Sequence, residues 1–148
     1  MEFILRNKPS LDYIAGLFDG EGWFTISVNK RPVGCKGPAH QVHAGLALRQ
    51  KEPLIELQRK FGGTVVIGAK ETFKHSVSYR WRITGNNVLD FAKVIKNRLI
   101  VKFKQAELAI MFQALKQQNT NQPSSPERRN LLEKCRVKMG QLNKRGPK

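Results

Sequence analysis

Cysteine is scarce in this sequence, and its scarcity excludes two classes of site. The 148 residues contain two cysteines, Cys35 and Cys135, which lie far apart and form no CxxC pair. A disulfide framework and a zinc site are therefore not expected. Free thiols are typical of proteins in a reducing compartment.

Long apolar runs and targeting signals are also missing. No stretch reaches the roughly 18 consecutive apolar residues of a membrane-spanning helix, so we expect no membrane partner. Residues 1–9 lack the apolar core of a signal peptide and the length and composition of a transit peptide. An intracellular location follows as the expectation, consistent with an organelle-encoded, bacterial or phage protein.

Acidic residues are few, and the imbalance of charge points to a class of partner. Asp and Glu number 11 against 27 Lys and Arg, which gives a net charge of +16 and a pI near 10.4. Such an excess repels itself in a compact chain, so a polyanion usually neutralises it. Ribosomal and membrane-surface proteins share this feature, and charge alone therefore indicates no mechanism.

The pattern of apolar residues predicts one α+β domain with an antiparallel four-stranded sheet and helices on one face. We expect helices over 11–19, 54–61, 86–95 and 104–116, and strands over 23–31, 41–50, 64–70 and 73–84. Pro53 suits the start of the second helix, and Asn86 or Asn87 the cap of the third. This core spans residues 1–118; a linker (119–125), a C-terminal helix (126–142) and a basic, disordered tail (143–148) follow it.

The sheet face without helices is the expected DNA-binding surface. Alternation along the strands places polar and basic side chains there that can contact base edges and phosphates. The expected DNA contacts, including flanking positions, are Ser27, Asn29, Arg31, Gln41, His43, Arg49, Lys70, Lys74, Arg80 and Arg82. The alternative is an ordinary solvated face, and the net charge favours nucleic acid. His40 and His75, like His43, are interpreted as base or phosphate contacts, and Trp23, Phe24 and Trp81 as core residues.

The first helix carries an unusual combination of small and acidic residues. Glycine in a helix interior costs about 1 kcal/mol relative to alanine, so a compensating reason for it is expected. The small residues Ala15, Gly16 and Gly20 would let another helix approach closely. Asp19 and Glu21 lie at the C-terminal end, beside carbonyl groups that lack intrahelical donors. Carboxylates and carbonyls together suit Mg²⁺ or Ca²⁺. Asp-Gly-Glu-Gly is also ordinary turn sequence, and the residues alone leave both interpretations open.

Residues 13–22, Tyr-Ile-Ala-Gly-Leu-Phe-Asp-Gly-Glu-Gly, closely resemble the signature of the LAGLIDADG homing endonucleases. The resemblance covers about residues 10–118. It includes the αββαββα order of elements, the strand end over residues 46–50 and the helix start over residues 102–106. Because the signature occurs once, the resemblance implies the single-motif, homodimeric subfamily.

The resemblance implies a site-specific double-strand DNA endonuclease that acts on a long pseudo-palindromic site. Glu21 and the Gly20 carbonyl would bind Mg²⁺, with Mn²⁺ or Ca²⁺ as substitutes, and Glu21, Gln50 and Lys102 would be catalytic. The motif helices of two copies would pack together through Ala15, Gly16, Asp19 and Gly20. Asp19 would have a structural role near the helix end.

One departure from the family pattern and two alternative functions remain. The family often has a basic residue where this chain has Leu54, and Lys51 or Lys104 could compensate. The same fold also serves intron RNA maturases, and intron RNA is therefore another potential partner. Non-catalytic DNA-binding regulators share the fold too, but the short segment after Gln117 leaves little room for their usual extra domain.

Overall fold

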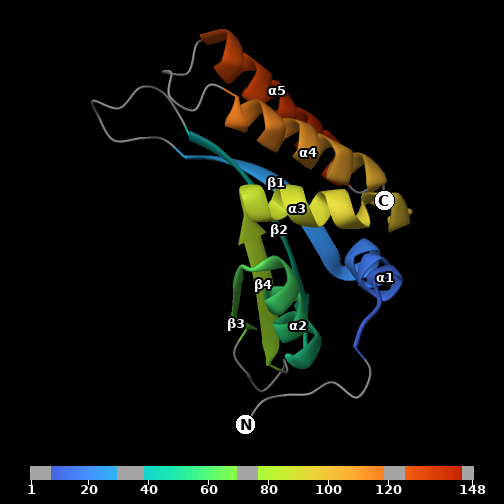
Figure 1. Cartoon of the computed structure of the whole chain (residues 1–148). Helices are drawn as coiled ribbons and strands as arrows, with labels where there is room; N and C mark the ends of the chain where they lie inside the picture. Colours follow the sequence, from blue (N-terminus) through green and yellow to red (C-terminus); the bar gives the residue numbers. More distant parts are fainter. Residues whose placement is uncertain (1–7, 30–38, 70–76, 119–125, 145–148) are drawn as a thin grey trace.

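The computed structural model of the chain describes residues 8–29, 39–69, 77–118 and 126–144. These form one antiparallel sheet whose strand order is β1-β2-β4-β3, with the helices packed against one face (Figure 1). The strands are β1 (Gly22–Asn29), β2 (Ala39–Leu48), β3 (Thr64–Ala69) and β4 (Ser78–Thr84). The helices are α1 (Leu11–Glu21), α2 (Glu52–Phe61), α3 (Asn86–Ile95), the short 3₁₀ helix η1 (Lys96–Arg98), α4 (Phe103–Gln117) and α5 (Pro126–Asn143). Among these described helices, none is long and apolar enough to span a membrane.

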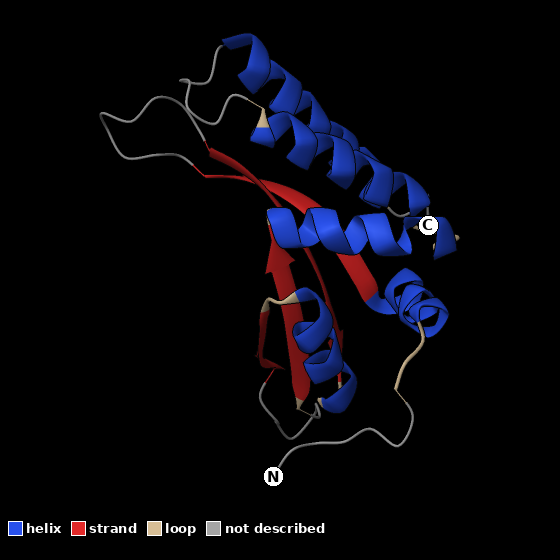
Figure 2. Cartoon of the chain, in the orientation of Figure 1, coloured by secondary structure: helices blue, strands red, loops and turns tan. Residues whose placement is uncertain are grey.

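The register of the sheet fixes which side chains share a face. β1 pairs with β2 from Gly22 opposite Leu46 to Asn29 opposite Ala39, and β2 continues to β4 with His43 opposite Thr84. β1 and β3 are therefore the two edges (Figure 2). Because side chains alternate along a strand, one face carries the core residues and the other remains free of helices.

Aromatic rings form the centre of the core between sheet and helices. Phe18 and Phe91 meet edge to face at 5.1 Å between ring centroids, and Phe91 meets Trp81 in the same way at 5.2 Å. Such edge-to-face pairs stabilise the fold by about 0.5–1.5 kcal/mol beyond the contribution of the area that they bury. The buried indole Nε1 of Trp81 donates to the Gly62 carbonyl at 2.9 Å, so its polar atom is satisfied.

Local sequence explains most of the helix ends. The Ser10 hydroxyl accepts from the backbone N–H of Tyr13 at 3.1 Å and caps α1, and Pro53 lies in the first turn of α2 as predicted. α2 ends at Gly62, whose φ of 78° suits glycine. The predicted cap of α3 was wrong: Gly85 is the N-cap, and Asn86 lies inside the helix and accepts side-chain hydrogen bonds from α4.

Three further predictions need correction. Trp23 does not lie in the core with Phe24 and Trp81. It is next to the buried Phe24 in β1, so alternation along the strand places it on the helix-free face. The last strand begins at Ser78, and Val77 is not part of it; residues 73–76 of the expected strand lie outside the described residues. The C-terminal helix extends to Asn143, whose Nδ2 donates to the Phe24 carbonyl at 2.8 Å, so this residue is not part of a disordered tail.

The helix α5 belongs to the same core as the sheet. Its residues Leu132, Cys135 and Met139 are buried, and the helix packs along α4 and against β1 (Figure 1). The C-terminal helix that the sequence predicts after the core over 1–118 therefore packs onto that core. Residues 119–125, the expected linker, and residues 145–148 of the expected tail lie outside the described residues.

Candidate active site and nucleic-acid interface

Glu21 ends helix α1 and lines an open hollow at the free edge of β1. The hollow has a volume of about 580 Å³. Its lining comes from the α1–β1 junction, from α4 and the residues before it, and from the end of α5: Gly20, Glu21, Gly22, Trp23, Thr25, Val101, Lys102, Gln105, Leu142 and Asn143. The Glu21 side chain is exposed, so its carboxylate is available to a ligand.

The neighbouring acid, Asp19, is used inside the protein. Its carboxylate accepts the backbone N–H groups of Ile100 at 2.7 Å, Val101 at 3.2 Å and Lys102 at 3.0 Å. These groups lie immediately before α4, of which Lys102 is the N-cap, and the positive N-terminal end of the helix attracts a carboxylate. Asp19 thus ties the end of α1 to the start of α4, in keeping with the structural role expected for it.

Lys102 is brought beside Glu21 by this tie. Its Nζ donates to the Asp19 carbonyl at 2.5 Å, and so places a positive charge at the negative C-terminal end of α1. Lys102 and Glu21 line the same hollow. The structure therefore brings together two of the three side chains that the sequence resemblance assigned to catalysis.

Gln50 and Leu54 are placed differently. Gln50 is exposed just after β2, and it makes no hydrogen bond within the described part of the chain. Leu54 is fully buried in the core, so the position that often carries a basic residue has no access to the hollow. Neither expected substitute lines it: Lys51 lies over Tyr79, 5.8 Å from the ring centroid, and Lys104 lines another hollow between α4 and α5.

The expected dimer contacts on α1 divide into two groups. Gly16 and Gly20 are exposed, and a Cβ atom added at either position would meet no atom within 4 Å. Ala15 has no exposed surface, because it faces the core of its own chain, so its assignment to a partner-facing surface was wrong. Asp19 is half-buried, with its carboxylate committed to α4. The open surface of α1 therefore runs along Tyr13, Gly16 and Gly20.

The helix-free face of the sheet carries the expected DNA contacts that the structure describes. Ser27, Asn29, Gln41, His43, Arg80 and Arg82 all lie on it by register. Arg49 is exposed beyond the end of β2. Arg31, Lys70, Lys74 and His75 lie outside the described residues, as does Cys35.

His43 is not a free contact on that face, because two neighbours hold its ring. Its Nε2 lies 2.7 Å from the Ser27 hydroxyl, and its Nδ1 lies 2.8 Å from Nη2 of Arg82. Burial, and then the positive charge of Arg82, lower the pKa of His43 below its ordinary value, which favours the neutral ring.

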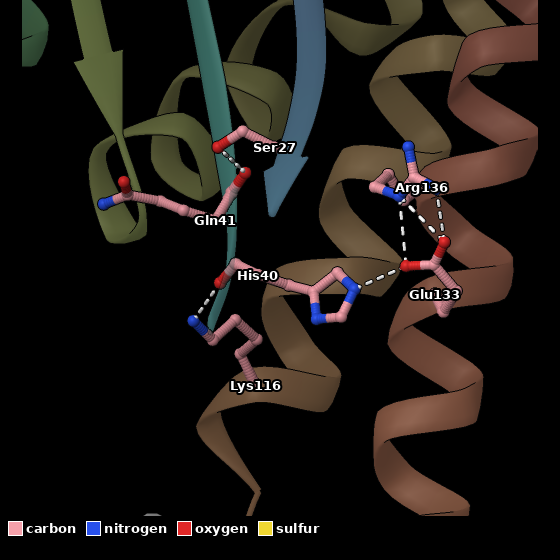
Figure 3. A network of polar contacts seen from close by, with 6 residues as sticks. All are labelled: Ser27, His40, Gln41, Lys116, Glu133 and Arg136. Atoms are coloured by element: carbon pink, nitrogen blue, oxygen red, sulfur yellow. Dashed lines mark hydrogen bonds and ion pairs between the residues drawn. The ribbon is translucent and has the colours of Figure 1, made fainter. Parts of the chain in front are cut away.

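His40, for which a base or phosphate contact is expected, is buried and points from β2 towards Glu133 of α5 (Figure 3). Its Nε2 lies 2.7 Å from a carboxylate oxygen of Glu133, which also pairs with Arg136 in α5. These contacts, led by the hydrogen bond from Arg136, lower the pKa of Glu133 to about 2. The Lys116 ammonium donates to the His40 carbonyl, so the network fastens the start of β2 to α4 and α5.

Sequence reasoning missed Gln105, Leu142 and Asn143 in the wall of the hollow. Gln105 is buried and donates to the Leu142 carbonyl at 3.2 Å. Its position directly after Lys104 and three residues after Lys102 was visible in the sequence. The approach of α5 to β1 was not, because it depends on how two distant helices pack.

The oxygen atoms around Glu21 fit a divalent cation whose remaining ligands come from elsewhere. Within the described residues, no three acidic, histidine or cysteine side chains gather into a metal cluster. Mg²⁺ is commonly held by one or two carboxylates, substrate phosphates and waters, so a complete protein cage is not required. Glu21 supplies the carboxylate, and the Gly20 carbonyl lacks an intrahelical donor.

Several solved structures share this fold. The homing endonuclease I-CvuI, solved in complex with a DNA target, is 19% identical, with a TM-score of 0.73 over 93% of this chain and 85% of that one. The homing endonuclease I-TnaI is 18% identical, with a TM-score of 0.71 over 92% and 95%. I-LtrWI, solved with its target DNA, is 20% identical, with a TM-score of 0.70; the match covers 93% of this chain but 46% of I-LtrWI.

Comparison with curated proteins finds no match. The sequence model described as LAGLIDADG endonuclease matches residues 14–115, which include the motif helix, all four strands and most of α4. These residues carry Glu21, Lys102 and the whole helix-free face. The chain therefore belongs to the LAGLIDADG endonuclease family, and it resembles the single-motif homing endonucleases in fold.

Proposed function

We propose that this homing endonuclease cleaves both strands of a specific DNA duplex, that it requires a divalent metal ion, and that it acts as a homodimer. The observation that carries the proposal is the exposed carboxylate of Glu21 beside Lys102, in a hollow at the edge of the sheet. The helix-free face adjoins this hollow, because Trp23 and Thr25 point from it into the lining.

Three residues of the hollow, Gly20, Glu21 and Lys102, have a defined task in this proposal. Glu21 and the Gly20 carbonyl hold the cation, which would activate water and stabilise charge on the scissile phosphate. The tie between Asp19 and the start of α4 fixes the position of Glu21 relative to Lys102. The ammonium of Lys102 offsets negative charge where the phosphate enters, in a chain that carries few acids.

A homodimer is supported by the open surface of α1 and by the lengths of the relatives. This chain covers 85–95% of I-CvuI and I-TnaI but about half of I-LtrWI and I-SmaMI, which leaves those chains room for a second unit of similar size. Gly16 and Gly20 allow a second helix to approach closely. Two copies would supply two Glu21 carboxylates, one for each strand of the duplex.

Cleavage tests the proposal directly. I-SmaMI has been seen bound to cleaved DNA and, with Ca²⁺, to an uncleaved target, which suggests selecting target duplexes in Ca²⁺ and then adding Mg²⁺. Wild-type protein should cut both strands of a selected duplex. Glu21→Gln should bind with nearly unchanged affinity and not cut, whereas Glu107→Gln, the same change at an exposed position outside the hollow, should cut like wild type. Full activity of Glu21→Gln would overturn the proposal.

A further inference from the structure

Two arginines on β4 are each held by an aromatic ring from another strand of the sheet: Arg82 by His43 of the adjacent β2, and Arg80 by Trp23 of β1, beyond β2. Nη2 of Arg82 lies 2.8 Å from Nδ1 of His43, and Cζ of Arg80 lies 5.8 Å from the ring centroid of Trp23. Together with Thr25, these four side chains line an open hollow of about 300 Å³ on the helix-free face. The arginines are two residues apart, so they project from the same face.

The hydrogen bonds around His43 run in one direction. A guanidinium can only donate, so Nδ1 of His43 accepts from Arg82. The proton of the neutral ring therefore lies on Nε2, which donates to the Ser27 hydroxyl at 2.7 Å. That hydroxyl in turn donates to the Gln41 carbonyl at 3.5 Å. Ser27 and Gln41 thus fix the ring that orients Arg82.

Gly45 creates the place where the Trp23 indole lies. Trp23 is opposite Gly45 in the register, and a Cβ atom at Gly45 would approach Cζ2 of the indole to 2.7 Å and the Trp81 carbonyl to 2.3 Å. Only a residue without a side chain lets the ring lie across β2 towards Arg80. The ring then supports the guanidinium through a cation–π contact.

Arginines held in this way match one feature of the DNA major groove. The planar guanidinium donates two hydrogen bonds to O6 and N7 of guanine, which is the commonest specific contact to a base. Restricting its rotation before binding reduces the entropy lost when the contact forms. Residues i and i+2 of a strand are about 7 Å apart. Stacked bases are about 3.4 Å apart along each DNA strand, so this spacing corresponds to two base-pair steps.

We propose that Arg80 and Arg82 are a preorganised pair that reads two guanines separated by one base pair in each half-site. Trp23 and His43 are the positioning residues of this pair, the former for Arg80 and the latter for Arg82. The hollow shares Trp23 and Thr25 with the one that Glu21 lines, so the two guanines lie close to the cleavage position. This inference rests on the proposed function, because it assumes that the helix-free face lies in the major groove.

A random duplex library tests which guanine depends on each arginine and on the ring that positions it. Full-length protein is mixed with the library in Ca²⁺, and the bound duplexes are sequenced to give a preference at every position. Wild type should select G-N-G in the inner part of each half-site. Arg82→Ala should reduce one of these guanine preferences about tenfold, and Arg80→Ala the other by a similar factor.

Substitutions of the two positioning residues should likewise each affect only one of the two guanine preferences. His43→Ala should weaken only the guanine that Arg82→Ala weakens, and Trp23→Leu only the guanine that Arg80→Ala weakens. Trp23→Phe keeps a ring and should restore much of the preference. A general loss of structure would flatten all positions together, and thermal unfolding of each variant identifies that case. His43→Gln then replaces His43→Ala if the latter fails to fold.

Two different failures are distinguishable. If the wild type selects no sequence and binds no duplex, the proposed function itself fails. If it selects a sequence without G-N-G, or if the ring variants change other positions or none, the arginine pair is overturned while the endonuclease assignment stands.

Discussion

Replacing Asp19 with alanine should destabilise the protein by up to about 3 kcal/mol. The substitution leaves three backbone N–H groups at the start of α4 without the carboxylate that they contact at 2.7–3.2 Å. Each net hydrogen bond contributes about 1 kcal/mol, and the charge at the helix N-terminus adds a few tenths. Partial exposure of the site lets water replace some of these contacts, so about 3 kcal/mol is an upper value.

Urea unfolding followed by circular dichroism measures this change. The unfolding midpoint should fall at constant slope, and the melting temperature should decrease by about 6–12 °C for a chain of this size. Asp12→Ala is the matched control, because it removes a carboxylate from the same helix. Asp12 pairs with Arg98 at the surface, and such pairs contribute about 0–1 kcal/mol.

Asp19 and Glu21 should respond differently when each carboxylate is replaced by an amide. Asp19→Asn should lower stability moderately and retain cleavage, whereas Glu21→Gln should retain stability and lose cleavage. If Asp19→Ala unfolds no more easily than Asp12→Ala, the carboxylate is not a significant tie between α1 and α4, and its position in the structure needs another explanation.

Three further predictions concern ionisable groups. The lowered pKa of His43 means that its contribution to stability is present above about pH 6.5 and is lost as the pH falls below that value. Between pH 8 and pH 5.5, the free energy of unfolding in urea should therefore decrease more for wild type than for His43→Gln. The pKa of Glu133 is lowered from 4.5 to about 2, so its contribution should disappear between those values, and Glu133→Gln should be less sensitive to acid over that range. Burial raises the pKa of the Cys135 thiol, so a Cys35→Ser variant should react with a thiol reagent slowly when folded and rapidly in urea. Rapid reaction of the folded variant would contradict the docking of α5.

The strands and most helices could be predicted because local patterns determine them. Alternation placed Phe24 and Ile26 in the core, and Ser27 and Asn29 on the opposite face, as the register confirms. Trp23 is expected in the core together with Phe24 and Trp81, although the alternation along its own strand places it on the opposite face. Its support by Gly45 could not be foreseen, because that contact depends on which residues of β1 and β2 are paired.

The site was predictable in its chemistry and only partly in its surroundings. The resemblance identified Glu21 and Lys102, and the structure places them in one hollow. It could not show that Ala15 faces inward, because the orientation of α1 is set by packing against the sheet. The roles of Gln105 and Asn143 depend on contacts between segments far apart in the sequence, which local patterns do not report.

If the proposed function holds, the fold separates the part assigned to chemistry from the part assigned to target recognition. Glu21 and Lys102 are joined through α1 and α4, whereas the side chains on the helix-free face rest on the strands and contribute little to the core. Target preference can therefore diverge in evolution, or be altered by design, while the cleavage machinery is conserved. The links from Ser27 through His43 to Arg82, and from Gly45 through Trp23 to Arg80, indicate that such changes succeed when each linked set is exchanged together.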